Sequence, residues 1–128
     1  MRAFYDDLAS DYHLIYEDWW SSVERQGRAL HALIETRLGT GSKRVLDCTC
    51  GIGTQALGLS WQGHRVLGTD LSEAAVSRAP KEARARDLAA EFQVWDVRSL
   101  ASLDEGPFDL VLSADNSLSH LKIGRAHV

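Results

Sequence analysis

Three short β-type runs in this chain each lead into an acidic residue, and this pattern most constrains the fold. The runs are Val45–Asp47, Arg65–Asp70 and Phe92–Val97, which contains Asp96. Their apolar residues are typical of strands buried in a parallel sheet, and the helical segments between them predict an α/β architecture. Because the carboxyl ends of parallel strands meet at one edge, we expect the acids to lie together there, where open α/β sheets bind ligands.

A loop with two glycines follows the first run. Gly51 and Gly53 lack a Cβ, so the backbone there can turn sharply and a ligand can approach the main chain closely. The next segment, Thr54–Leu59, is predicted to be a helix whose first N–H groups are free and point toward the same edge. This combination favours a nucleoside-type ligand held across the strand ends.

The segment before the first strand carries a helical pattern. Its apolar residues recur at steps of three and four over positions 23–38. Ser21 is predicted to cap this helix, with Glu24 in the capping-box position. Gly39–Gly41 are predicted to end it.

Two more elements are expected after the second strand. A helix is predicted to begin near Ser72, but it contains Pro80. Proline lacks the N–H donor and clashes with the preceding turn, so we predict that this helix is kinked or divided into two short pieces. A fourth strand is predicted over Phe108–Ser113.

Composition limits the classes of partner. The 128 residues are 45% hydrophobic and 25% charged, which suits one globular domain. The formal net charge is −4 and no basic run exceeds Lys43–Arg44, so neither nucleic acid nor an anionic membrane is an expected partner. The sequence shows no signal-peptide or membrane-span pattern, so we expect a cytoplasmic location and small-molecule chemistry.

The chain has two cysteines, Cys48 and Cys50, two residues apart in the glycine loop. No second pair completes a zinc site. Free cysteine often behaves as a small hydrophobe, so we interpret both as turn-filling residues and expect no metal.

The glycine loop and the strand-end acids resemble those of class I S-adenosylmethionine-dependent methyltransferases, most closely the glycine and sarcosine N-methyltransferase-like group. This resemblance implies a Rossmann-like, doubly wound parallel sheet, incomplete here after about four strands. It also implies S-adenosylmethionine as cofactor and methyl transfer to a small-molecule acceptor such as an amine. In the family's first motif, Asp47 takes the acidic place, Gly51 and Gly53 take glycine places, and Thr49 stands where many members have glycine or alanine.

The resemblance assigns adenosine contacts to the next two strand ends. Asp70 would accept hydrogen bonds from both ribose hydroxyls, and Leu71 would form an apolar wall against the adenine. Asp96 would accept from the adenine amino group, and the amide of Val97 would donate to a ring nitrogen. The alternative for each acid is an exposed strand-end carboxylate without a ligand.

The resemblance also assigns contacts to the methionine end of the cofactor. Asp47 or its loop would meet the amino group, and Arg25 would bind the carboxylate with its planar fork. Tyr16 shares a helical face with Tyr12 and would place an aromatic ring near the sulfonium, as would Tyr5. A solvated arginine and a simple aromatic packing patch are the alternatives.

The segment after the fourth strand resembles the Asn-Ser-x-x-His-Leu motif of the same group. Ala114 would lie beside the cofactor, Asn116 at the strand end and His120 near the acceptor. The alternative for His120 is a histidine at a helix start with satisfied ring nitrogens. No catalytic base is assigned beyond this histidine, and the oligomeric state is left open.

Two other functional classes are considered. The pattern from Gly51 to Ala56, with Asp70 near a ribose, also fits a nicotinamide-dinucleotide oxidoreductase, although the acid before the loop would lie close to the pyrophosphate. The second class is a catalytically inactive fragment. We expect residues 1–122 to be the N-terminal part of a methyltransferase domain, with a lid and helix over 1–43 and the cofactor-binding half over 44–122. Residues 123–128 read like a translated sequencing adapter and are expected to be a non-native tail.

Overall fold

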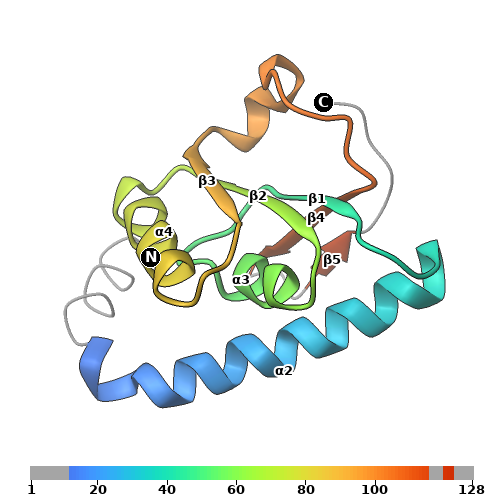
Figure 1. Cartoon of the computed structure of the whole chain (residues 1–128). Coiled ribbons are helices and arrows are strands. Elements are labelled where there is room, and N and C mark those ends of the chain that lie inside the picture. The colour runs from blue at the N-terminus through green and yellow to red at the C-terminus, as the bar shows by residue number, and fades with distance from the viewer. Residues whose placement is uncertain (1–11, 116–119, 123–128) are drawn as a thin grey trace.

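The structure is a computed structural model in which residues 12–115 and 120–122 are described, with side chains described from 18 to 113 except residue 101 (Figure 1). One sheet and its flanking helices make up this part of the chain. The elements, labelled as in Figure 1, are α2 Tyr12–Leu38, β1 Arg44–Asp47, α3 Thr54–Trp61, β2 Arg65–Asp70, α4 Glu73–Ala85, β3 Glu91–Val94, the 3-10 helix η1 Val97–Ser102, β4 Leu110–Asp115 and β5 His120–Lys122.

The sheet has the strand order β3-β2-β1-β4-β5. The four strands expected from the sequence are all parallel: β1 pairs with β2 and β4, and β3 pairs with β2. The chain runs outward from β1 to β3 and then returns to the other side of β1 as β4. This reversal places a topological switch point between β1 and β4, the position at which open α/β sheets bind ligands.

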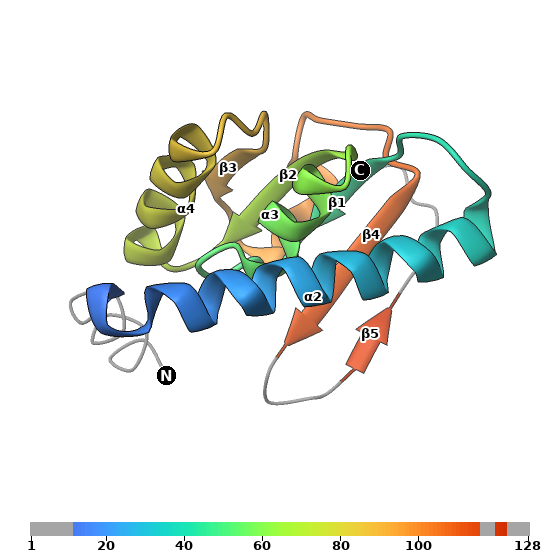
Figure 2. The same cartoon turned by 60° about the horizontal axis from the view of Figure 1, so that its bottom comes forward.

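The antiparallel strand β5 was not expected from the sequence. It pairs with β4 at the edge of the sheet, with Asp115 opposite His120 (Figure 2). The interpretation of His120 as a residue at a helix start is therefore wrong. Pairing with β5 satisfies backbone groups along an edge of β4 that would otherwise be unpaired.

The core lies on both faces of the sheet, because neighbouring strand residues point in opposite directions. Val45 and Val66 pack with Ile34 of α2 and residues of α3 on the face covered by the helices (Figure 1). Leu46 and Leu67 pack on the other face, in a cluster that includes Leu103, Cys48 and Phe108. Burial on both sides explains the continuous apolar runs of β1 and β2.

Helix α2 is longer than the sequence pattern predicted. It runs without a break from Tyr12 to Leu38, so the prediction that Ser21 caps its N-terminus is wrong. Ser21 is exposed on the helix surface, and the helix continues for nine residues before it. The predicted end is confirmed: Gly39 has φ +86° and its N–H donates to the carbonyl of Glu35 at 3.0 Å.

The prediction that Pro80 divides the helix after β2 into two pieces is also wrong. Helix α4 begins after Ser72, whose hydroxyl accepts from the N–H of Ala75 at 3.2 Å, and continues through Pro80 to Ala85. Val76 and Ala83, on either side of the proline, are buried in the core. Packing on both sides compensates for the hydrogen bond that proline removes. Within the described residues, no helix has both the length and the apolar character needed to cross a membrane.

Helices α2 and α3 cross at two glycines. A Cβ on Gly58 would lie 2.6 Å from the carbonyl oxygen of Val23 and 2.9 Å from Cα of Gly27. A Cβ on Gly27 would likewise lie 2.6 Å from the carbonyl oxygen of Gly58. The two backbones are therefore closer than any other residue pair would allow, which fixes α2 over the start of α3.

Gly58→Ala is expected to lower the free energy of unfolding by about 1–3 kcal/mol, because overpacking at this crossing outweighs the gain in helix propensity. Urea denaturation measures the change. Ser21→Ala is the matched control on the exposed face of α2 and is expected to change stability by less than about 0.5 kcal/mol. Equal stability of Gly58→Ala and the wild type would contradict the close crossing.

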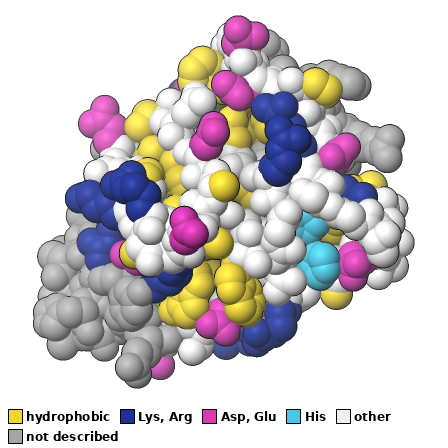
Figure 3. All heavy atoms as spheres, in the orientation of Figure 1, with side chains coloured by type: hydrophobic (Ala, Val, Ile, Leu, Met, Phe, Trp, Pro, Cys, Tyr) yellow, Lys and Arg dark blue, Asp and Glu magenta, His cyan; other side chains and the backbone are white. Residues whose placement is uncertain are grey.

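The far end of α2 is joined to the start of β2 by two histidines. Nδ1 of His31 lies 2.9 Å from Nε2 of His64, and the backbone N–H of Lys43 donates to Nδ1 of His64 at 3.0 Å. The two ring centroids are 5.1 Å apart, and histidine side chains (cyan) are visible on the face shown in Figure 3. Burial, with His31 adding to the effect, lowers the pKa of His64. The pair is at the amino ends of the strands and so lies away from the ligand-binding edge.

Candidate functional site

Asp70 ends β2 and organises the glycine loop. Its Oδ2 accepts from the N–H of Gly51 at 2.8 Å, and its Oδ1 accepts from the N–H of Ser72 at 3.0 Å. The carboxylate thus joins the loop after β1 to the start of α4. A carboxylate has about four lone-pair sites, so each oxygen can still accept one further donor.

Asp47 ends β1 and is fully buried. Its Oδ1 accepts from the N–H of Thr49 at 3.4 Å, but Oδ2 has no hydrogen-bond partner among the described residues. Burial raises the pKa of this carboxyl to about 7, and the neighbouring charge of Asp70 adds to the effect. Two strand-end acids are therefore adjacent: Asp70 accepts from two backbone amides, and one oxygen of Asp47 has no partner among the described residues.

Asp96 follows β3, which ends at Val94 and not at Val97 as predicted. Its carboxylate accepts from the backbone N–H of Arg98 at 2.9 Å and from Nη2 of the same residue at 2.7 Å. The guanidinium of Arg98 lowers the pKa of Asp96 to about 2. Asp96 thus lies at the expected edge but pairs with an exposed arginine, a kind of contact that is easily exchanged.

The glycine loop leaves space above its backbone. Gly51 has φ +54°, and a Cβ built on it would meet nothing within 4 Å. Gly53 has φ +96° and precedes the first residue of α3. The space beside Gly53 is filled, because a Cβ there would lie 3.1 Å from the side chain of Ala79. Gly51 is therefore the position where a ligand can approach the main chain.

Two apolar side chains are exposed near the acids. Leu71, directly after Asp70, is 59% exposed, and Val97, directly after Asp96, is 41% exposed. Together they offer a surface for a flat apolar ring beside two carboxylates.

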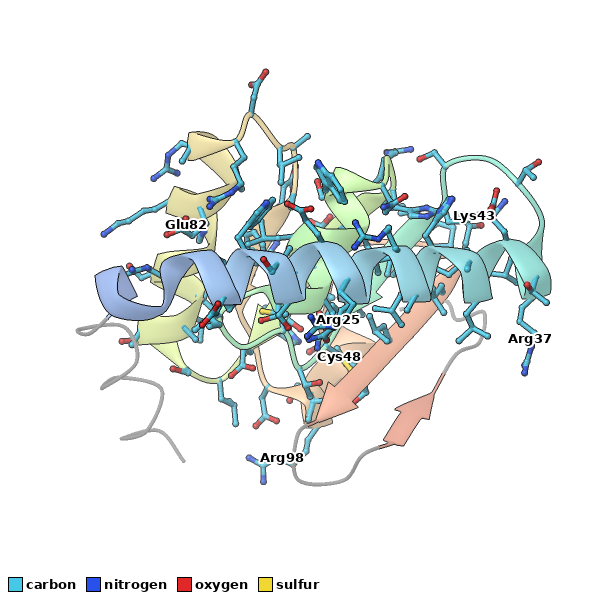
Figure 4. All side chains as sticks on the ribbon, turned by 90° about the horizontal axis from the view of Figure 1, so that it is seen from below. Arg25, Arg37, Lys43, Cys48, Glu82 and Arg98 are labelled. Carbon is cyan, nitrogen blue, oxygen red and sulfur yellow. The ribbon has the colours of Figure 1, made fainter. Side chains whose placement is uncertain are left out.

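Arg25 lies on α2 and is exposed. Figure 4 shows it on the side of the helix toward the carboxyl end of β4. Its Nη2 donates weakly to the hydroxyl of Ser22 at 3.5 Å. The hydroxyl of Ser22 also accepts from Gln26 at 2.8 Å, and Gln26 in turn accepts from Gln55 of α3 at 2.6 Å. The guanidinium is thus largely available for an anionic group.

Two contacts at this edge were missed by the sequence analysis. Nε1 of Trp19 donates to the hydroxyl of Thr54 at 3.0 Å, which ties α2 to the first residue of α3. The hydroxyls of Thr49 and Ser113 lie 3.3 Å apart and link the glycine loop to β4. These pairs are 35 and 64 residues apart in sequence, so no local pattern identifies them.

The cysteines of the loop are packed into the core. Cys50 belongs to the cluster on the helix-covered face, and Cys48 belongs to the cluster on the opposite face. Burial raises the pKa of both thiols. Among the described residues, no group of three or more histidine, cysteine or acidic side chains is placed to hold a metal ion.

Several predicted site residues have undescribed side chains. Tyr12 and Tyr16 lie on α2, Ala114 lies on β4 and His120 lies on β5, with only their backbone described. Tyr5 and Asn116, together with the expected tail at 123–128, lie outside the described residues. The roles predicted for them stay predictions.

Comparison with known proteins gives consistent matches. Residues 45–127 match the family described as a methyltransferase domain. A putative methyltransferase from Geobacillus sp. (strain WCH70) is 30% identical over 92% of this chain and 43% of its own length. A glycine/sarcosine N-methyltransferase from Parasynechococcus marenigrum (strain WH8102) is 32% identical over 81% of this chain and 36% of its own length. This chain therefore spans less than half the length of these two relatives.

A solved structure agrees with the sequence relatives. The crystal structure of a TehB-like SAM-dependent methyltransferase from Corynebacterium glutamicum matches 92% of this chain and 58% of that chain, with 26% identity and a TM-score of 0.64. Other relatives are named as ubiquinone biosynthesis O-methyltransferases and as an uncharacterized RNA methyltransferase, so the acceptors differ among them. These matches support the methyltransferase interpretation and not the nicotinamide oxidoreductase alternative. With its strand order and family match, the chain belongs to the class I S-adenosylmethionine-dependent methyltransferases.

Proposed function

We propose that this chain is the cofactor-binding part of an enzyme that transfers the methyl group of S-adenosylmethionine to a small-molecule acceptor, an amine in the reading that we favour. The observation that carries the proposal is the Asp70 carboxylate, which joins the glycine loop to α4 and keeps acceptor capacity toward the open space above Gly51. The net charge of −4 favours a small acceptor over nucleic acid. A cytoplasmic location remains the expectation from the sequence.

The described residues fit the adenosyl part of the cofactor. Asp70 would accept from the two ribose hydroxyls with its remaining lone pairs. The exposed side chains of Leu71 and Val97 would cover the two faces of the adenine, which removes apolar surface from water. Asp96 would accept from the adenine amino group once Arg98 moves aside, and the amide of Val97 would donate to the ring.

The described residues also fit the amino-acid part. Asp47 has a buried oxygen without a partner in the described part of the chain, which an ammonium group nearby would compensate. Arg25 offers an exposed planar fork for the carboxylate. Thr49 would stay beside the cofactor through its contact with Ser113 at the end of β4. Tyr16, Ala114 and His120 keep the roles near the sulfonium and the acceptor that the resemblance implies.

When bound, S-adenosylmethionine supplies a methyl group on a positively charged sulfur, which a nucleophile attacks in line with the departing sulfur. Such a reaction needs orientation and the exclusion of water more than a strong base. The residues of this chain would supply orientation: carboxylates fix the ribose and the ammonium, and the close crossing of α2 over α3 fixes Arg25 relative to the glycine loop.

Thermal unfolding with alternative cofactors tests the proposal. S-adenosylhomocysteine is expected to raise the melting temperature of the chain in a concentration-dependent manner, because a ligand that binds only the native state stabilises it by mass action. NAD⁺ at the same concentrations is the matched comparison and is expected to leave the melting temperature unchanged. A shift with NAD⁺ alone would contradict the proposal and favour a dinucleotide site.

A further inference from the structure

Among the described residues, the carboxyl group of Asp47 has no partner that explains its complete burial. It lies at the end of the central strand β1, between β2 and β4, with none of its surface exposed. Within the part of the chain that the structure describes, one backbone N–H, that of Thr49, donates to it, and that contact is long at 3.4 Å. An ionised carboxylate in such a place is costly unless it is paired.

The groups that face Asp47 do not supply a positive charge. From β2 comes Asp70, which is charged and adds repulsion. From the loop come the buried thiols of Cys48 and Cys50, which stay neutral because burial raises their pKa values. From β4 comes the neutral hydroxyl of Ser113, which contacts Thr49. No lysine, arginine or histidine within the described residues forms an ion pair with this carboxyl.

We propose that, at slightly acidic pH, Asp47 is protonated in the cofactor-free protein and releases that proton when a ligand with a cationic amino-acid end binds over the glycine loop. This inference rests on the proposed function and adds a property to it, namely that cofactor binding is coupled to proton release. The balance is simple: the carboxylic acid of Asp47 becomes a carboxylate facing the ligand's ammonium, and the proton passes to the solvent.

The energetics of the site favour this coupling near neutral pH. Burial holds the pKa of Asp47 at about 7 without a ligand. An ammonium about 4–6 Å away lowers the pKa of a carboxyl by about one to three, even without direct contact. At pH 6, Asp47 must therefore release its proton before it can attract the ligand's ammonium, which weakens binding. At pH 8 the carboxyl group is already ionised before the ligand binds.

Titration calorimetry with two adenosyl ligands tests the proposal on the whole chain. S-adenosylhomocysteine carries the ammonium, and 5′-methylthioadenosine shares the adenosyl part but lacks the amino-acid end. The dissociation constant of the first is expected to rise about tenfold from pH 8 to pH 6, given the value of about 7 for Asp47. The dissociation constant of 5′-methylthioadenosine is expected to change by less than twofold over the same range.

Repeating the titrations in buffers with different ionisation enthalpies then measures the number of protons released on binding. Near pH 6.5, S-adenosylhomocysteine is expected to release most of one proton and 5′-methylthioadenosine none. Asp47→Asn is expected to remove both the pH dependence and the proton release, while Asp104→Asn, an exposed acid, keeps them. Equal pH profiles for the two ligands would overturn the inference alone, and absence of binding by both would overturn the proposed function with it.

Discussion

Replacing Asp70 with asparagine is expected to weaken the binding of S-adenosylhomocysteine about 100-fold. The carboxylate uses one lone pair on each oxygen for the N–H groups of Gly51 and Ser72, and the others are proposed to receive the ribose hydroxyls. Hydrogen bonds to a charged group contribute about 1.5–3 kcal/mol each, and asparagine can replace only one acceptor oxygen. Isothermal titration calorimetry at pH 8 measures the change.

The same substitution also weakens the loop, so the control must separate folding from binding. Circular dichroism should show that Asp70→Asn keeps its secondary structure at the temperature of the titration. Asp104→Asn, which changes an exposed acid, is expected to bind as the wild type does. A folded Asp70→Asn protein with unchanged affinity would contradict the ribose assignment.

Replacing Asp47 with asparagine is expected to raise the free energy of unfolding at pH 8 by up to about 4 kcal/mol. Burial raises the pKa of Asp47 from its usual value of 3.8 to about 7 in the folded protein. A change of one in pKa corresponds to a free-energy difference of about 1.4 kcal/mol. Between pH 3.8 and pH 7, Asp47 therefore holds its proton in the native state but not in the unfolded state. Stability from this group is therefore fully present below pH 3.8 and is lost as the pH rises toward 7.

Urea denaturation at pH 4 and pH 8 measures this effect as a difference between variant and wild type. The advantage of Asp47→Asn should be small at pH 4, where the wild-type carboxyl is protonated in the folded state, and large at pH 8. Asp104→Asn should show no such dependence. An advantage of the same size at both pH values would mean that Asp47 does not carry a buried charge.

The sequence predicted the part of the fold that depends on local hydrophobic patterns. The strands beginning near Val45, Arg65 and Phe92 are present and parallel. For the first two, apolar runs that are buried on both faces have few alternatives. The glycine loop and α3 also follow from local conformational preference. The position of Asp47 and Asp70 on adjacent strands then follows from the parallel order.

The remaining features depend on contacts that compete with local preference. Serine is a residue type that often caps helices, but α2 begins at Tyr12, before Ser21. Pro80 disfavours a helix locally, but burial of Val76 and Ala83 keeps α4 whole. At the candidate site, the pairing of Asp96 with Arg98 involves neighbours but competes with the ligand contact that the resemblance implied. Local preference alone could not decide these cases.

A nuclear magnetic resonance titration of the chain with S-adenosylhomocysteine tests most directly whether the strand-end carboxylates and the glycine loop bind the adenosyl group. The account predicts that the backbone amide signals of Gly51, Ser72 and Val97 shift together and saturate, while those of Arg44 and Arg65, at the opposite ends of the strands, stay in place. Shifts that cluster around Arg44 and Arg65 and spare the loop would contradict it.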